Sequence, residues 1–284
     1  MQSLWMLAAS FLFACMGVCV KLAATRYSAA EIVFYRSVIA LALMAGLVRL
    51  RGVSLRTPYL RLQVTRGVVG FVSLLLYFYA ITLLPLATAV TLNYTSPLFL
   101  AAFLACSGSL RPRSGFVWVL LTGFVGVAVL LQPTLSQEQW LGGLIGLGSG
   151  LGAGLAYFNV RELGERGEPE ARTVFYFSLL STLGGSLWMA FHEFHPIDGV
   201  GALLLLGVGV FATLAQMAMT RSYKRGRAMV SASLAYTAVV FASVFGVLLW
   251  GERLGWSSWL AIALVIASGM AATQVARANP AEQD

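Results

Sequence analysis

The sequence predicts an all-α polytopic membrane protein with ten transmembrane helices, arranged as two inverted five-helix repeats. Composition is the first reason, because the 284-residue chain is 59% hydrophobic and only 11% charged. The second is a series of continuous apolar runs of about 20 residues, the length that crosses a bilayer. Continuous runs are typical of helices, whereas a membrane barrel alternates apolar and polar residues. The third is a repeat at half the chain length.

Ten apolar runs follow one another with short connections. The predicted spans are Leu4–Val20, Ile32–Val48, Val68–Leu84, Thr88–Cys106, Phe116–Leu131, Leu141–Val160, Val174–Phe191, Gly201–Met219, Met229–Trp250 and Trp256–Ala276. Pro85 separates the third span from the fourth, because proline cannot donate a backbone hydrogen bond. The sixth span is rich in glycine, which favours close helix packing. No long linker marks a soluble domain.

Lys and Arg predict the orientation. If the N-terminus is cytoplasmic, the cytoplasmic loops and end hold Arg49, Arg51, Arg56, Arg61, Arg66, Arg111, Arg113, Arg161, Arg166, Arg172, Arg221, Lys224, Arg225, Arg227 and Arg277. The outer loops hold only Lys21, Arg26 and Arg253, and Arg36 lies within the second span. Such a bias places both termini in the cytoplasm of a multi-pass inner (plasma) membrane protein. It also accounts for the net charge of +8 without nucleic acid as a partner.

The two halves of the chain repeat. The segment Tyr94-Thr95-Ser96-Pro97-Leu98-Phe99 matches Tyr236-Thr237-Ala238-Val239-Val240-Phe241, and Phe34-Tyr35 meets Tyr176-Phe177 at the same offset. We therefore expect two five-helix domains, residues 1–135 and 136–284. Five is odd, so the second copy enters the membrane inverted, an arrangement that recurs in secondary transporters.

Several short motifs carry a resemblance to a known family. They are Phe34-Tyr35-Arg36, the block from Tyr79 to Ala89, Thr95-Ser96-Pro97-Leu98-Phe99 and Trp250-Gly251-Glu252. With them the chain resembles the ten-helix, EamA-type members of the drug/metabolite transporter superfamily over nearly its whole length. The resemblance implies a central cavity built from spans 1, 3, 4, 6, 8 and 9. One departure is Gly108-Ser109, where relatives often have Gly-Glu.

Polar side chains at membrane depth are the candidate substrate-binding residues, because they are costly there unless they face a cavity or a partner. The candidates are Asn93, Tyr94, Tyr157, Gln216, Tyr236, Tyr77 and Arg36. The alternative is hydrogen bonding between helices, which we favour for Ser231 and Ser233. Arg36 is either an anchor for a substrate carboxylate or an ion-paired or snorkelling arginine. Tyr77 and Tyr79 point to different faces, so at most one lines the cavity.

These features predict a secondary transporter that works by alternating access. Export of an amino-acid-like compound or metabolite derivative is the preferred function, and import of a vitamin or nucleotide-like metabolite is the alternative. A non-transporting membrane scaffold is the alternative of another class. Neither a Walker-type loop nor a cluster of catalytic or metal-ligating residues is evident, so we expect no enzyme activity, cofactor or metal. The expected partners are a small-molecule substrate and the bilayer, and a homodimer is left open.

Overall fold

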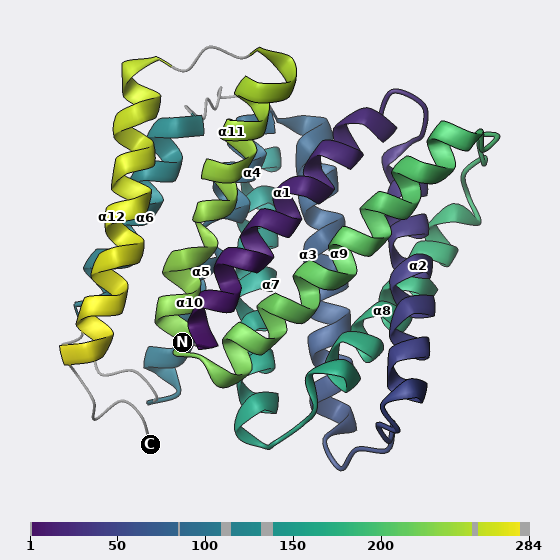
Figure 1. The fold of residues 1–284 in the computed structure, drawn as a ribbon, viewed down its shortest axis with the longest axis horizontal. Coiled ribbons are helices and arrows are strands. Elements are labelled where there is room, and N and C mark those ends of the chain that lie inside the picture. The colour runs from purple at the N-terminus through teal and green to yellow at the C-terminus, as the bar shows by residue number, and fades with distance from the viewer. Residues whose placement is uncertain (1, 85, 109–114, 132–138, 252–254, 279–284) are drawn as a thin grey trace.

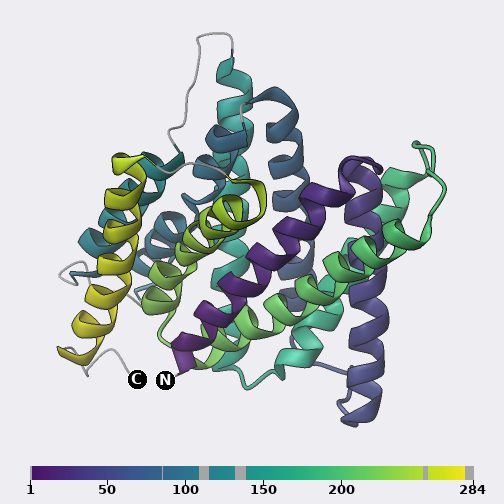
Figure 2. The ribbon, with the colours of Figure 1, turned by 45° about the horizontal axis from the view of Figure 1, so that its top comes forward.

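The computed structural model describes residues 2–84, 86–108, 115–131, 139–251 and 255–278. Within them the chain is a bundle of α-helices with short connections (Figures 1 and 2). After a 3-10 turn at Gln2–Leu4, the helices are α1 (Trp5–Ala23), α2 (Ala29–Leu50), α3 (Leu60–Leu83), α4 (Leu86–Asn93), α5 (Ser96–Cys106), α6 (Phe116–Leu131), α7 (Trp140–Glu165), α8 (Glu170–Met189), α9 (Gly199–Arg225), α10 (Ala228–Ala235), α11 (Thr237–Trp250) and α12 (Trp256–Ala278). The sequence features that lie outside the described residues are Pro85, Ser109, Arg111, Arg113, Glu252 and Arg253.

The all-α membrane fold is confirmed, whereas the count of ten spans stays a prediction. Among the described residues, eight helical segments are long and apolar enough to cross a membrane, and a shorter apolar helix covers Val117–Val129. Helix α8, which holds the predicted seventh span, is not one of the eight. Serine and threonine interrupt its apolar sequence, and Thr173, Ser178 and Ser181 on its buried face lie against neighbouring helices rather than lipid.

The fourth and ninth predicted spans are each broken into two helices. Helix α4 ends at Asn93 and α5 begins at Ser96. Pro97 explains this break, because it has no amide hydrogen to donate to the carbonyl of Asn93. The ninth span breaks at Tyr236, between α10 and α11. Tyr236 is the residue that the sequence repeat pairs with Tyr94, so both halves break at the same point.

Both breaks use the same hydrogen bond. The Thr95 hydroxyl donates to the carbonyl of Leu92 over 2.6 Å. The Thr237 hydroxyl donates to the carbonyl of Leu234, also over 2.6 Å. Each bond satisfies a carbonyl that the interrupted helix leaves without its usual partner. The two halves therefore share the same local backbone structure at the positions that the sequence repeat pairs.

Helix contacts follow the same symmetry. Helix α3 packs against α7 as α9 packs against α1, and α5 packs against α7 as α11 packs against α1. Helices α2 and α8 pack against each other, and so do α6 and α12. These two pairs form opposite edges of the bundle in Figure 1, with the other helices between them. This arrangement fits a repeated two-domain architecture, and the inverted orientation of the second repeat stays a prediction.

Glycines let α7 approach the broken helix closely, as the sequence predicts. A Cβ atom at Gly150 would lie 2.7 Å from the carbonyl oxygen of Leu92, and one at Gly154 would lie 2.9 Å from that of Ser96. Real Cβ atoms essentially never approach another atom that closely. Any larger residue at these positions would push α7 away from the break between α4 and α5.

Glu168 joins the two halves at one end of the bundle. Its carboxyl, 3% exposed, accepts hydrogen bonds from Thr57 (2.7 Å), Gln63 (2.8 Å) and Arg172 (2.9 and 3.0 Å). The Lys224 ammonium donates to its backbone carbonyl over 3.0 Å. Burial acts to raise the pKa of the Glu168 carboxyl, but these hydrogen bonds and the charge of Arg172 outweigh burial and lower it. We call these five residues the Glu168 cluster.

A second carboxylate joins the halves at the opposite end. Glu31, in the first turn of α2, accepts hydrogen bonds from the backbone nitrogen of Ser28 (2.8 Å) and from that of His195 (2.6 Å). The His195 ring adds a contact of 2.8 Å from Nδ1. Ser28 and Glu31 form a capping box, which fixes the start of α2. The α2 and α8 pair is thus held at both ends.

The described ends of the chain lie at the same end of the bundle. Figures 1 and 2 both place the start of α1 and the end of α12 together. The α2–α3, α7–α8 and α9–α10 connections lie at that end too in Figure 1. These are the segments rich in arginine, so the arrangement agrees with the predicted topology. The side of the membrane stays a prediction.

Candidate functional site

One face of α3 carries polar or small residues into the bundle. They recur at alternating spacings of three and four residues, which places them on one side of a helix. The residues are Gln63, Arg66, Gly70, Ser73 and Tyr77. Gln63 and Arg66 are buried, and Tyr77 is half-buried. The stripe runs from the Glu168 cluster toward the middle of the bundle.

Arg66 is the largest departure from the sequence prediction. The sequence placed it in a loop before a span that starts at Val68, which is wrong, because α3 begins at Leu60 and Arg66 is 2% exposed. Its guanidinium lies over the Phe177 ring, 3.9 Å from the centroid. Its Nη2 donates to Oε1 of Gln216 over 3.4 Å. Its Nε and Nη1 are buried without a hydrogen-bond partner.

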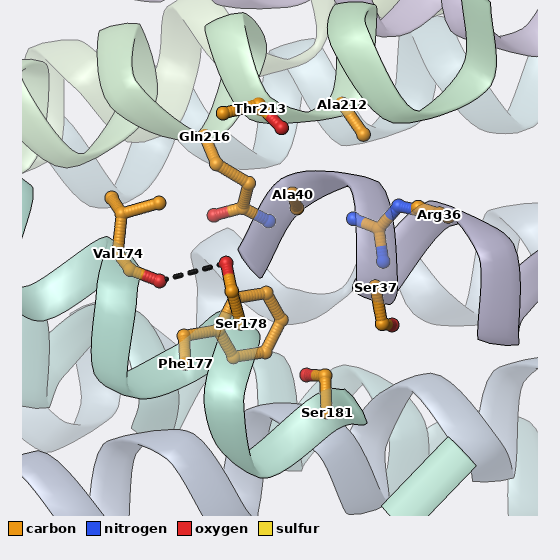
Figure 3. Close-up of a pocket in the computed structure, with 10 residues that line it drawn as sticks. All are labelled: Arg36, Ser37, Ala40, Val174, Phe177, Ser178, Ser181, Ala212, Thr213 and Gln216. Carbon is orange, nitrogen blue, oxygen red and sulfur yellow. Dashed lines mark hydrogen bonds between the residues drawn. The ribbon is translucent and has the colours of Figure 1, made fainter. Parts of the chain in front are cut away.

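Arg36 lies near Arg66 and lines a pocket. The pocket is narrow, with free space of about 10 Å³, roughly that of one water molecule. It is lined by Arg36, Ser37, Ala40, Val174, Phe177, Ser178, Ser181, Ala212, Thr213 and Gln216. The Arg36 guanidinium and the Gln216 amide both point into the space between α2, α8 and α9 (Figure 3). The guanidiniums of Arg36 and Arg66 are close enough to repel each other electrostatically.

These two arginines carry charge that the described protein does not neutralise. Among the described residues, neither guanidinium lies within salt-bridge distance of a carboxylate, and Nε of Arg36 is buried without a partner. Burying an ion costs several kcal/mol, whereas the stacking of Arg66 on Phe177 returns only about 0.5–2 kcal/mol. The structure thus shows no ion pair for Arg36 among the described residues, and its role as a substrate anchor or a snorkelling arginine stays a prediction. Both charges therefore lack a counter-ion among the described residues.

Five tyrosines from both halves of the chain gather beside the arginines. Tyr94 and Tyr236, at the two helix breaks, face each other with ring centroids 6.3 Å apart. Tyr157 stacks on Tyr223 at 4.9 Å with an angle of 16° between the rings. Tyr77 and Tyr157 lie within electrostatic range of the Tyr94 hydroxyl. The symmetry-related tyrosines therefore meet where the two repeats meet.

The arginines and tyrosines form one continuous polar interior. Tyr157 lies within electrostatic range of Arg66 as well as of Tyr94. Tyr77, Tyr94 and Tyr157 keep accessible surface although protein surrounds them. Polar side chains from both repeats thus face one another inside the bundle. We call this region, with Arg36, Arg66 and Gln216 at its edge, the chamber.

Two predicted site residues make packing contacts instead. Asn93 donates from Nδ2 to the Ser149 hydroxyl over 3.1 Å, which ties the break between α4 and α5 to α7. Tyr236 is 0% exposed, its hydroxyl has no partner, and a Cβ at Gly123 would lie 2.6 Å from its ring. Contact of Asn93 and Tyr236 with substrate stays a prediction.

Interhelical hydrogen bonding by the two serines of the ninth span is confirmed. The hydroxyls of Ser231 and Ser222 lie 2.7 Å apart, which joins α10 to α9. The hydroxyls of Ser233 and Ser268 lie 2.8 Å apart, which joins α10 to α12. Tyr79, in turn, is 55% exposed on the outer surface, so Tyr77 is the tyrosine of α3 that faces inward.

Sequence reasoning missed Arg66 and Tyr223. The spacing of Arg66 with Gly70, Ser73 and Tyr77 was a usable signal, because a small and polar stripe marks a face that packs inside the bundle. Tyr223 lies seven residues after Gln216, on the same face of α9, beyond the predicted end of that span. Both residues lie outside the predicted spans because α3 begins before its apolar run and α9 continues beyond its own.

Several named transporters match this chain over most of its length. The pseudopaline exporter CntI of Pseudomonas aeruginosa is 35% identical over 247 residues, which cover 86% of this chain and 86% of the relative. A riboflavin transporter of Vibrio cholerae is 26% identical over 96% of this chain and 92% of the relative. A solved crystal structure shares the fold with a TM-score of 0.85 over 97% of this chain and 98% of the other, at 22% identity.

The family is shown by two consecutive matches. A sequence model described as the EamA-like transporter family matches residues 1–132 and again residues 140–272. Each match covers about one half of the chain, in agreement with the repeated helix breaks at Tyr94 and Tyr236. The chain therefore belongs to the EamA-like transporter family, whose members are multi-pass membrane proteins with small-molecule substrates.

Proposed function

We propose that the protein is a secondary transporter that exports a small polar metabolite, amino-acid-like or a metabolite derivative, by alternating access. The chamber supports this proposal, because unpaired charge and tyrosine hydroxyls at membrane depth are costly unless they meet a substrate. The pseudopaline exporter, the relative with 35% identity, supports export. The riboflavin transporters support the alternative of an importer, at lower identity.

The transported molecule would bind where the two repeats meet. Tyr77, Tyr94 and Tyr157 would offer aromatic faces and hydroxyls, and Gln216 and Arg36 would offer polar contacts at the edge of the chamber. Asn93 and Tyr236 would hold the broken helices in place around it. The repeats, residues 1–135 and 136–284, would move relative to each other to open the chamber to either side in turn.

We place the protein in the inner membrane with both termini cytoplasmic. The excess of arginine in the connections that share one end of the bundle supports this orientation. The Glu168 cluster would then close the cytoplasmic end, and Glu31 with His195 the outer end. A homodimer is compatible with this arrangement, and transport by the chamber would not require one.

The test is metabolite profiling of medium and cytosol from cells that carry the wild type, Gln216→Ala or an empty vector. We expect a compound that accumulates in the medium with the wild type and not with Gln216→Ala. Leu214→Ala, on the exposed face of α9, is the matched control and should export normally. A compound depleted from the medium and raised inside would establish import. No difference from the empty vector would favour the non-transporting scaffold.

A further inference from the structure

We propose that Arg36, Arg66 and Gln216 form a binding site for a carboxylate of the substrate, so that the cargo is a small organic anion. This inference rests on the proposed transport function and assigns its substrate class. It adds Arg66, on α3, to the candidate substrate-binding residues. It also assigns one ligand, the substrate carboxylate, to Arg36, Arg66 and Gln216 together.

The first argument is the set of unused donors. Arg66 is almost wholly buried, yet Nε and Nη1 have no partner and only Nη2 is engaged, by Gln216. Nε of Arg36 is buried without a partner too, and its guanidinium points into the pocket (Figure 3). Gly70 leaves room for the Arg66 fork, since a Cβ there would lie 3.0 Å from Nη1. A carboxylate accepts two parallel bonds from such a fork.

The second argument is charge. The two guanidiniums are close enough to repel each other, and among the described residues no carboxylate compensates either of them. An anion between them would remove that repulsion and supply the missing acceptors. Phe177 stacks on Arg66 from one side, which fixes the plane of the fork.

The third argument separates a carboxylate from a phosphate. A phosphate group has three terminal oxygens and needs more donors than a carboxylate. The pocket hydroxyls do not supply them, because Ser37 donates to Val33, Ser178 to Val174 and Thr213 to Gly209 within their own helices (2.7–2.9 Å). Only Ser181 has an unpartnered hydroxyl there. Two guanidinium forks with few further donors fit a carboxylate.

The binding test uses the purified full chain in detergent with three probes: glutarate, its uncharged diamide glutaramide, and inorganic phosphate. A ligand that binds only the folded state raises the unfolding temperature, which tryptophan fluorescence follows. We expect a saturable rise with glutarate and none with glutaramide. No rise with glutarate, an equal rise with glutaramide, or a rise with phosphate alone would overturn the carboxylate site.

Variants assign the binding to the two arginines. Arg66→Met and Arg36→Met should each weaken glutarate binding by about 10- to 100-fold, the range for losing hydrogen bonds to a charged group. Arg61→Met, at an exposed position of the same helix, is the control and should bind like the wild type. If Arg66→Met does not fold, Arg66→Lys replaces it, because lysine keeps the charge and loses the fork. Unchanged affinity in both arginine variants would contradict the assignment.

Export in cells separates this inference from the proposed function. If the wild type exports a compound that carries a carboxylate and Arg36→Met does not, the transport function and the carboxylate site are both supported. If the exported compound has no carboxylate, or Arg36→Met exports it equally, transport stands and the carboxylate site is wrong. If the wild type exports nothing, the proposed function fails, and the glutarate measurement alone decides the site.

Discussion

Glu168→Gln should destabilise the protein, because the substitution removes the charge at the centre of the Glu168 cluster. The carboxylate accepts four hydrogen bonds, two of them from Arg172. Glutamine has nearly the same size and keeps one oxygen. Its amide nitrogen, however, is a donor, and it would face the donors of Thr57, Gln63 or Arg172. The acceptor that the second carboxylate oxygen provides would be lost. The change therefore tests the charge and hydrogen bonds without opening a cavity.

The structure sets the magnitude. The Glu168 side chain is 3% exposed and that of Arg172 is 12% exposed, so water compensates little. Breaking a buried ion pair by removing one partner costs about 3–5 kcal/mol. Because glutamine retains one acceptor, we expect a loss of about 2–4 kcal/mol. At about 2–4 °C per kcal/mol for a chain of this size, the unfolding temperature should fall by roughly 5–15 °C.

The assay is thermal unfolding in detergent, and Glu165→Gln is the matched control. Glu165 forms an ion pair with Arg161, one turn earlier in α7, over 2.6 Å, but the Glu165 side chain is 48% exposed. An exposed pair is worth about 0–1 kcal/mol, so this control should unfold close to the wild type. If the unfolding temperature of Glu168→Gln falls no further than that of Glu165→Gln, the cluster does not hold the two halves together and the reasoning is wrong.

Two more predictions concern the pH dependence of the Glu168 cluster and the glycine at the break between α4 and α5. Because the pKa of Glu168 is lowered, its carboxylate stabilises the fold above the unfolded-state pKa of about 4.3 and loses that effect as the pH falls through the lower folded-state value. The gap in unfolding temperature between wild type and Glu168→Gln should thus stay constant down to about pH 5 and shrink below it; a gap that widens in acid would contradict this. Gly150→Ala should cost about 1–3 kcal/mol, because its Cβ meets the backbone at the break between α4 and α5. Gly46→Ala, with open space around it, is the control and should leave stability unchanged or raised.

The sequence predicted the repeat because the repeat depends on local chemistry. The segments that begin at Tyr94 and Tyr236 share Tyr, Thr and Phe at equivalent positions, and the structure breaks a helix at both and brings the two rings together. The breaks themselves were not predicted, since hydropathy treats each span as one apolar run. Pro97 marked the first break, whereas the second has no proline.

The chamber was predicted only in part, because charge near the end of an apolar run is ambiguous. Arg66 satisfied the rule that places arginine in cytoplasmic loops, and so it was counted as a loop residue. Its burial depends on Gly70, Phe177 and Gln216, two of which come from other helices. Tyr77, Tyr94 and Tyr157 could be found from the sequence, because a polar aromatic residue within an apolar run needs no distant partner to be noticed.

Export by Tyr77→Ala and Tyr79→Ala, at equal membrane levels, tests the central claim most directly. The two tyrosines lie on the same helix, but Tyr77 faces the chamber and Tyr79 is exposed on the outer surface. If substrate passes through the chamber, Tyr77→Ala should lose most export of the compound that the wild type releases, and Tyr79→Ala should keep it. Equal export by the two variants would contradict the claim that this interior carries the substrate.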